Sequence, residues 1–153
     1  MRTDLWTCTA CGRPFANTHQ PHSCGRLSEE AFLEPASEGE RHLYARSREL
    51  AMACGDVATA PARTRVGFQA RMIFAAVNAL GGGTLAAHVV LARRLESPRF
   101  HRIDLITARC FVHHLRVSSE AELDDEVRGW LAESYEVGEQ RARPSPSQES
   151  RRL

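Results

Sequence analysis

The chain has 153 residues, of which 42% are hydrophobic and 25% are charged, and its formal net charge is +1. This composition excludes a chain that is disordered throughout, and the near-zero net charge excludes a strong overall attraction to nucleic acids or anionic membranes. No apolar run approaches the roughly 20 residues that span a bilayer, and no apolar signal core precedes the first cysteine. We therefore expect a cytoplasmic protein without a membrane partner.

The first 40 residues differ in composition from the rest of the chain. Residues 1–26 are rich in Cys, His and Thr and poor in aliphatic residues, so they cannot build a conventional core. Residues 27–40 contain a short helical start that Pro35 interrupts, followed by an acidic linker. The next segment, 41–54, has apolar residues at helical spacing and ends before Gly55, which is typical of an amphipathic helix.

The middle of the chain has the patterns of β-strands. Residues 63–71 alternate between polar and apolar positions, which is the period of a half-buried strand. Two apolar segments then flank three consecutive glycines, and this arrangement predicts a hairpin. The further strands are predicted in the segments 72–80, 84–93, 101–106 and 110–117. Together these segments predict a mostly antiparallel sheet with one covered face.

The last predicted element is a helix over residues 119–138. Ser119 and Glu122 have the spacing of a capping box, and the residues that follow place an apolar stripe at helical spacing. Beyond residue 138 the chain is dominated by Pro, Ser and Arg, which is typical of disorder. The predicted α+β organisation is a small module at 1–26, in which the clustered cysteines and histidines are typical of a zinc knuckle, a linker at 27–40, a domain with two helices flanking the sheet at 41–138, and a disordered tail at 139–153.

Three cysteines near the N-terminus predict a metal site. In a reducing compartment, clustered cysteines are more often metal ligands than disulfides. Cys8 and Cys11 have the spacing at which one tight turn directs two thiolates at a tetrahedral ion, and Gly12 follows where such a turn needs positive φ. Cys24 supplies a third thiolate. One histidine imidazole would complete the four ligands of a tetrahedral zinc ion and leave no open position for a substrate. We therefore expect one structural zinc ion per chain and no catalytic metal.

The fourth zinc ligand is either His22 or His19. The spacing permits both, and His22 is preferred because the loop 15–20 can then pack beneath the metal. Trp6 and Phe15 are expected to cover the site. A segment this short and polar is expected to be unfolded without its metal.

The N-terminal residues also form one longer pattern, W-x-C-x-x-C-G-R-x-F-x-x-x-x-Q-x-H-x-C, at Trp6, Cys8, Cys11, Gly12, Arg13, Phe15, Gln20, His22 and Cys24. This pattern resembles the N-termini of bacterial proteins that carry domain of unknown function 5655, and the similarity continues to residue 138. The resemblance implies an α+β fold and a zinc site with His22 as the fourth ligand. It implies no reaction, because the family is uncharacterised. Relatives tend to carry basic residues in the hairpin turn, whereas this chain has three glycines, so we expect no phosphate-binding role for that turn.

Arginines are the first candidate ligand-binding residues of the larger domain. All 20 basic residues are arginine, as the codon bias of a GC-rich bacterial genome would produce. Arg63, Arg65 and Arg71 are expected on one face of the strand 63–71, where converging guanidinium groups could bind phosphates. A solvated strand face is the preferred interpretation, and a phosphate-binding face is the alternative.

Histidines are the second candidates. His113 and His114 are adjacent in a predicted strand and should point to opposite faces, so they cannot act as one site. Each is more typical of a hydrogen-bonded, half-buried histidine, although one of them could line a pocket with His88 or His101 nearby.

The sequence contains no P-loop, dinucleotide-binding, nucleophile-elbow or metalloprotease pattern, and this weakens an enzymatic function. We predict a binding or regulatory module with a structural zinc ion, whose partner is a nucleic acid or a protein. One alternative is a nucleic-acid-binding protein that uses the knuckle and the arginine-lined strand. Another is a small-molecule-binding protein or enzyme with a pocket on the sheet, formed by Arg65, Arg71 and a histidine.

Overall fold

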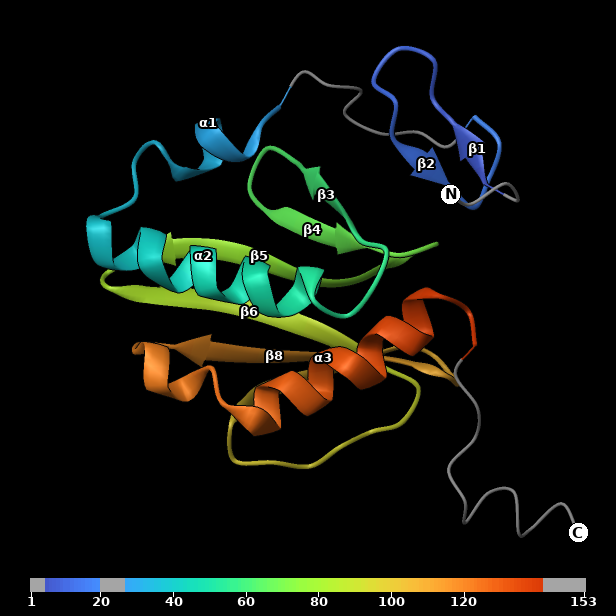
Figure 1. The fold of residues 1–153 in the computed structure, drawn as a ribbon. Helices are drawn as coiled ribbons and strands as arrows, with labels where there is room; N and C mark the ends of the chain where they lie inside the picture. Colours follow the sequence, from blue (N-terminus) through green and yellow to red (C-terminus); the bar gives the residue numbers. More distant parts are fainter. Residues whose placement is uncertain (1–4, 20–26, 142–153) are drawn as a thin grey trace, which may run out of the picture.

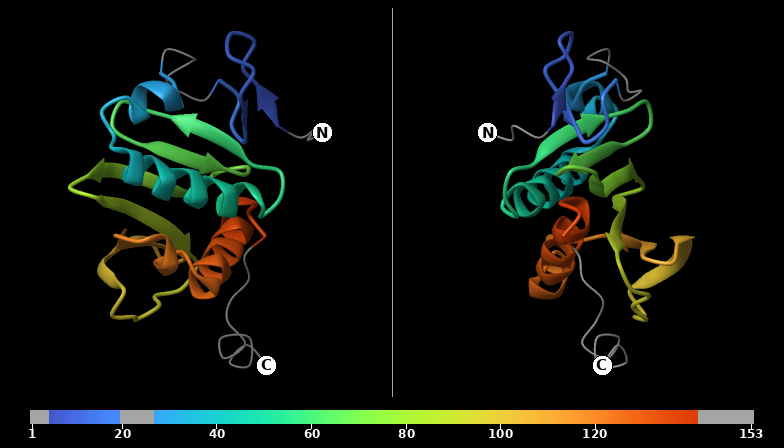
Figure 2. Two further views of the ribbon diagram at one scale, coloured as in Figure 1. Left: turned by 60° about the vertical axis from the view of Figure 1, so that its left-hand side comes forward. Right: turned by 90° about the vertical axis from the view of Figure 1, so that its right-hand side faces the viewer.

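The computed structural model describes residues 5–19 and 27–141. Its centre is a six-stranded antiparallel sheet in the order β3-β4-β5-β6-β8-β7 (Figures 1 and 2). The strands are β3 (Ala58–Pro61), β4 (Val66–Gln69), β5 (Ile73–Gly81), β6 (Thr84–Leu91), β7 (Phe100–Thr107) and β8 (Cys110–Val117). Helices α2 (Glu38–Met52) and α3 (Asp125–Gly138) pack on the same face of the sheet, as the right-hand view of Figure 2 shows. This confirms the α+β fold with a mostly antiparallel sheet and two flanking helices.

The N-terminal part contains smaller elements. Strands β1 (Trp6–Thr7) and β2 (Pro14–Phe15) form a separate two-stranded antiparallel sheet. Helix α1 (Glu29–Leu33) is the short helix predicted before Pro35. The predicted ligands His22 and Cys24, the matched Gln20 and the tail from residue 142 lie outside the described residues.

Helix α2 begins three residues earlier than predicted. Its N-cap is Ser37, whose hydroxyl accepts a hydrogen bond from the Glu40 amide at 3.2 Å. The Glu40 side chain accepts one from the Ser37 amide at 2.9 Å, which completes a capping box. The second carboxylate oxygen of Glu40 accepts from the amide of Gly83, at 2.8 Å. The acidic residues that suggested a linker therefore start the helix and attach it to the β5–β6 turn.

The predicted start of the last helix at Ser119 was wrong. Residues Glu120–Glu122 form a short 3-10 turn, and the Ser119 side chain makes no capping hydrogen bond to it. Helix α3 starts after Asp124, whose carboxylate accepts from the Val127 amide at 3.2 Å. An aspartate is as good a cap as a serine, and this one lies directly before the buried stripe of the helix.

The hairpin around the three glycines is confirmed, and a second hairpin was missed. Gly82 and Gly83 have positive φ values of 59° and 79° in the β5–β6 turn, as that turn type requires. The strand predicted over 63–71 is shorter, because only Val66–Gln69 pairs with neighbours. Residues 63–64 instead form the turn that joins β4 to the unpredicted β3, where the Ala62 amide donates to the Arg65 carbonyl.

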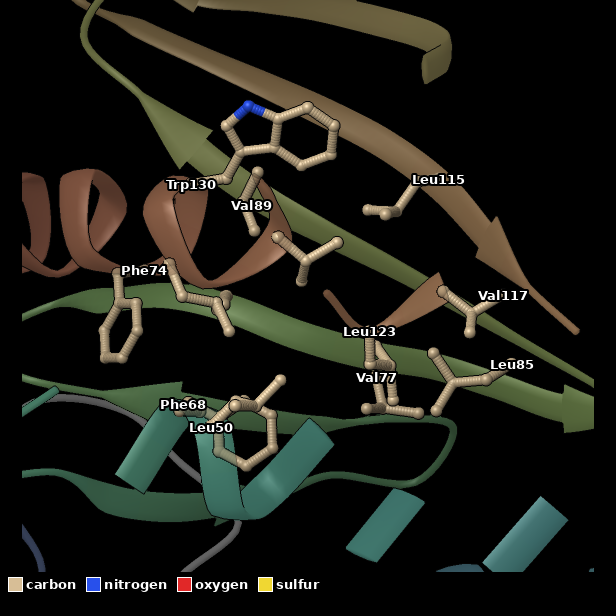
Figure 3. Close-up of a cluster of buried hydrophobic side chains, with 14 of the residues drawn as sticks. Leu50, Phe68, Phe74, Val77, Leu85, Val89, Leu115, Val117, Leu123 and Trp130 are labelled. Atoms are coloured by element: carbon tan, nitrogen blue, oxygen red, sulfur yellow. The ribbon is translucent and has the colours of Figure 1, made fainter. Parts of the chain in front are cut away.

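The hydrophobic core lies between the sheet and helices α2 and α3 (Figure 3). Side chains from the sheet alternate, and those that face the helices are the most buried. The almost fully buried apolar residues of the sheet include Val66, Phe74, Val77, Leu85, Leu91 and Val117. Trp130 of α3 packs on Phe100 of β7 with ring centroids 4.5 Å apart. Within the described residues, none of the helices combines the length and apolarity of a bilayer-spanning segment.

Two glycines of α3 provide a test of this packing. A Cβ atom on Gly138 would lie 2.8 Å from the Cβ of Phe74 and 3.0 Å from the Met72 carbonyl oxygen, whereas one on Gly129 would meet nothing within 4 Å. We expect Gly138→Ala to lower the free energy of unfolding by about 1–3 kcal/mol through overpacking. Gly129→Ala should raise it by up to about 1 kcal/mol, because glycine is a poor helix former. Urea denaturation measures both, and a Gly138→Ala variant as stable as the parent would contradict the packing.

Candidate functional site

The first candidate site is the turn that carries Cys8 and Cys11. The Gly12 amide donates to the Cys8 carbonyl at 2.8 Å, and the Cys8 amide donates to the Arg13 carbonyl at 3.0 Å. Gly12 has a φ of 77°, which is the left-handed conformation predicted for it. The turn thus presents both cysteines from one short loop between β1 and β2. Within residues 5–19 and 27–141, no three side chains are grouped as metal ligands.

Aromatic residues pack together beside this turn. Phe15 is buried, and its ring centroid lies 5.9 Å from that of Trp6. His19, the alternative fourth ligand, is exposed, and its ring lies 5.0 Å from Trp6. The choice between His19 and His22 stays a prediction, because His22 is outside the described residues.

Gln69 connects the cysteine turn to the large sheet. Gln69, at the end of β4, is 2% exposed. Its side-chain amide donates to the Pro14 carbonyl, and its carbonyl oxygen accepts from the Arg13 guanidinium at 3.2 Å. The same guanidinium stacks on the ring of Phe15, 4.4 Å from its centroid. Burial lowers the pKa of Arg13, and the nearby Cys8 and Cys11 partly offset that effect.

The three arginines predicted on one strand face are separated. Arg63 is exposed in the β3–β4 turn, and Arg65 is exposed immediately before β4. Arg71 follows the end of β4 and donates to the side chain of Gln140, after α3, at 2.9 Å. The expected common face was therefore wrong, because the strand is too short to include all three residues.

The histidine pair is divided between the two faces of the sheet, as predicted. His113 is 0% exposed on the face covered by the helices, with its ring centroid 4.8 Å from that of Phe100. Its Nε2 accepts from the Leu95 amide at 2.9 Å, so its Nδ1 carries the proton and donates to the Phe111 carbonyl at 3.0 Å. Burial lowers the pKa of this imidazole, which is consistent with a neutral structural residue.

His114 points to the other face of the sheet, which we call the open face because α2 and α3 leave it uncovered. It is the direct cross-strand neighbour of His88 on β6, and their ring centroids lie 5.7 Å apart. The Nε2 of His114 contacts Asp104 Oδ2 at 3.0 Å. The other oxygen of Asp104 accepts from Arg102 at 2.8 Å. Hydrogen bonds from both groups lower the pKa of this carboxyl, although its burial opposes them.

His88 is buried although it lies on the open face. It is 7% exposed, and its Nδ1 lies 3.1 Å from Asn78 Oδ1. Asn78 is the extra residue of a bulge in β5, and the bulge directs its side chain toward β6. Desolvation, followed by the charges of His114 and Arg65, lowers the pKa of His88 to about 4. The imidazole is therefore neutral at pH 7.

Positive groups surround these histidines. The charge of Arg65 contributes to the lowered pKa of His88. The pKa of the exposed His101 is lowered by desolvation and then by the charges of Arg116, His114 and Arg102. In the described part of the chain, Arg65 and Arg116 make no ion pair with a carboxylate. We call this set the basic cluster, and it comprises Arg65, Asn78, His88, His101, Arg102, Asp104, His114 and Arg116.

Arg65, His88, His101 and His114 were candidate or neighbouring residues in the sequence, whereas Asn78, Arg102 and Asp104 were missed. The bulge that directs Asn78 has no local sequence signal. Arg102 and Asp104 could have been placed by aligning the strands 101–106 and 110–117 as a hairpin, which sets Arg102 opposite His114.

The lowered pKa of His88 predicts a pH-dependent contribution to stability. An unfolded histidine titrates near 6.5, so between about pH 6.5 and 4 the unfolded chain binds a proton that the folded chain does not. This contribution is complete above pH 6.5 and is lost as the pH falls, up to about 3 kcal/mol in all. We expect His88→Gln to have a shallower loss of stability over this range than the parent in urea denaturation. The exposed His42→Gln is the control, and identical slopes for parent and His88→Gln would contradict the assignment.

Comparison with known families connects this architecture to a group of proteins. A family model described as "Domain of unknown function (DUF5655)" matches residues 29–138, which extend from α1 through the sheet to the end of α3. The match includes the whole basic cluster and leaves out the cysteine turn. No curated protein and no solved structure matches the chain. The matched region is most of the 153 residues, so the chain belongs to the family of domain of unknown function 5655.

Proposed function

We propose that this protein binds the phosphate backbone of a single-stranded nucleic acid on the open face of its sheet. We further propose that a structural zinc ion stabilises the N-terminal hairpin formed by β1 and β2. The nucleic-acid proposal is supported by the basic cluster. Within the described residues, Asp104 is the only carboxylate that is hydrogen-bonded to other members of this cluster. The zinc part rests on the cysteine turn.

The basic cluster is spread across the sheet rather than gathered at one point. Arg65 adjoins β4 and Arg102 lies on β7, four strand spacings away. At about 4.8 Å per spacing the cluster extends roughly 19 Å. This is several times the roughly 3.4 Å of helix axis that each phosphate of one duplex strand occupies, so the shape suits a polymer better than a single phosphate group. An open sheet face also suits a single strand, whose backbone and bases are both accessible.

The small net charge of the chain does not oppose this proposal. Binding depends on where charges lie, and many arginines elsewhere are neutralised by neighbouring carboxylates. Arg93 is paired with Glu133 at 2.9 Å, and Arg99 with both Asp124 and Glu126 at 3.0 Å. Arg65 and Arg116 have no such partner among the described residues, and they would be available to phosphates.

The alternative of a small-molecule pocket is less well supported. It required Arg65, Arg71 and a histidine to gather at one place on the sheet. Arg71 is hydrogen-bonded to Gln140 beyond the end of α3, and His113 is enclosed in the core. The remaining groups form a surface across several strands, which favours the polymer.

The proposed zinc ion explains how the N-terminal hairpin keeps its shape. Strands β1 and β2 have two residues each, and the hairpin buries little more than Cys8 and Phe15. So small an apolar core cannot offset the entropy of ordering the segment. Two cysteines presented by one turn, with Arg13 balancing the negative charge of the thiolates, suit a zinc site that Cys24 and His22 would complete. Zinc binding would then supply the folding free energy of the hairpin.

Metal analysis tests the zinc site. We expect one zinc ion per purified chain, and loss of that ion in Cys8→Ser, Cys11→Ser and Cys24→Ser. Between His22→Ala and His19→Ala, only the first should lose the metal. Cys54→Ser is the control, because Cys54 lies after α2 and packs against the main core. A metal-free parent with a folded N-terminal hairpin would contradict the site.

Fluorescence anisotropy with a labelled single-stranded oligonucleotide tests the binding face. Affinity at 50 mM salt should fall as salt rises, with a log–log slope of about −0.7 for each phosphate contacted. Arg65→Ala and Arg116→Ala should each weaken binding and make that slope less steep by about 0.7. Arg128→Ala on the exposed side of α3 is the control and should change neither. Absence of binding at 50 mM salt, or affinity that is indifferent to salt, would overturn the proposal.

A further inference from the structure

The two edges of the sheet differ in how they are protected. The edge strand β3 has only four residues, includes Pro61, and is joined to α1 by a hydrogen bond from the Thr59 hydroxyl to Glu29 at 3.3 Å. The opposite edge strand, β7, has eight residues and pairs only with β8 within the described residues. Its outer side therefore presents backbone amide and carbonyl groups that can pair with another strand.

Strand β7 also carries exposed apolar side chains. Leu105 is 64% exposed and Ile106 is 61% exposed, and the only other exposed large apolar side chain in the described residues, Met72, is 43% exposed. Edges that stay unpaired are normally protected by charged residues, bulges, proline or short length, and β7 has charged residues and bulges but is long and also exposes these apolar side chains. A long edge strand with exposed apolar residues is a template on which another strand can pair.

The charges on β7 are complementary to the same strand in reverse. Arg102 and Asp104 are two residues apart, so they lie on the same face, with Ile103 between them. If two copies of β7 run antiparallel about a two-fold axis at Ile103, Arg102 of each copy lies opposite Asp104 of the other. The register that brings these opposite charges together also places Leu105 opposite His101.

We propose that β7 pairs with β7 of a second copy of this chain, antiparallel and centred on Ile103, so that the two sheets become one. Bulges in the β7–β8 pairing at both ends of β7 leave a short regular stretch, so side-chain complementarity has to select the register. Asp104 would keep His114 on its Oδ2 atom, while its Oδ1 atom, now held by Arg102 of the same chain, would face Arg102 of the partner. The dimer would join two basic clusters into one continuous face, and it does not depend on what that face binds.

Charge reversal tests this interface on the full, zinc-loaded chain. Light scattering after size exclusion should give twice the chain mass for the parent. Arg102→Asp and Asp104→Arg should each give a monomer, because each change sets like charges opposite each other at two symmetric positions. The double variant should be dimeric again. An equimolar mixture of the two single variants should also form dimers, since every charge then faces its opposite.

The matched control is Arg128→Asp, an exposed reversal on α3 that should leave the dimer intact. Asp104→Arg also removes the partner of His114, so circular dichroism should confirm that this variant is folded, and Arg102→Asp provides the same test without that complication. A parent that is monomeric across a dilution series would overturn the proposal. A dimer that survives Arg102→Asp would overturn it as well, because the contact would then lie elsewhere.

Discussion

The structure depends on one geometric constraint, which is that successive side chains of a strand point to opposite faces while only one face is covered by helices. His113 and His114 show its effect most directly. The first is enclosed in the core and has both ring nitrogens satisfied by backbone groups, whereas the second faces the open side and is held by Asp104. Two identical residues, adjacent in the chain, therefore have different chemistry, because burial and hydrogen-bonding partners determine whether an imidazole can carry charge.

The same constraint accounts for the position of the basic cluster. The apolar side chains of the sheet pack against helices α2 and α3, so the polar side chains that alternate with these apolar residues lie on the open face. Cross-strand pairing then aligns residues that are far apart in the chain, such as His88 and His114. The result is a surface with several positive groups and one hydrogen-bonded carboxylate, in a chain whose overall charge is close to zero.

Within its described residues, the N-terminal hairpin is not stabilised by a hydrophobic core of its own. Its own apolar contacts are few, and its described connection to the sheet passes through the buried amide of Gln69. A buried amide that is satisfied on both sides fixes position more than it adds stability, because its hydrogen bonds replace those it made with water. This is why we propose a metal ion as the source of the folding free energy of the hairpin, and why the hairpin and the large domain are tested separately.

The sequence by itself determined the features that depend on local chemistry. The Cys8–Cys11 turn with Gly12, the glycine hairpin, the division of His113 from His114 and the two flanking helices all follow from spacing, φ preference or period. Only the tertiary structure decided which strands are neighbours and in what register. Register between distant segments depends on their hydrogen bonds and on bulges, so it alone aligned His88 with His114 and directed Asn78 at His88. Residues whose roles come from their own neighbours in the chain or from an adjacent hairpin strand were predictable, whereas residues whose roles come from a strand distant in the sequence were not.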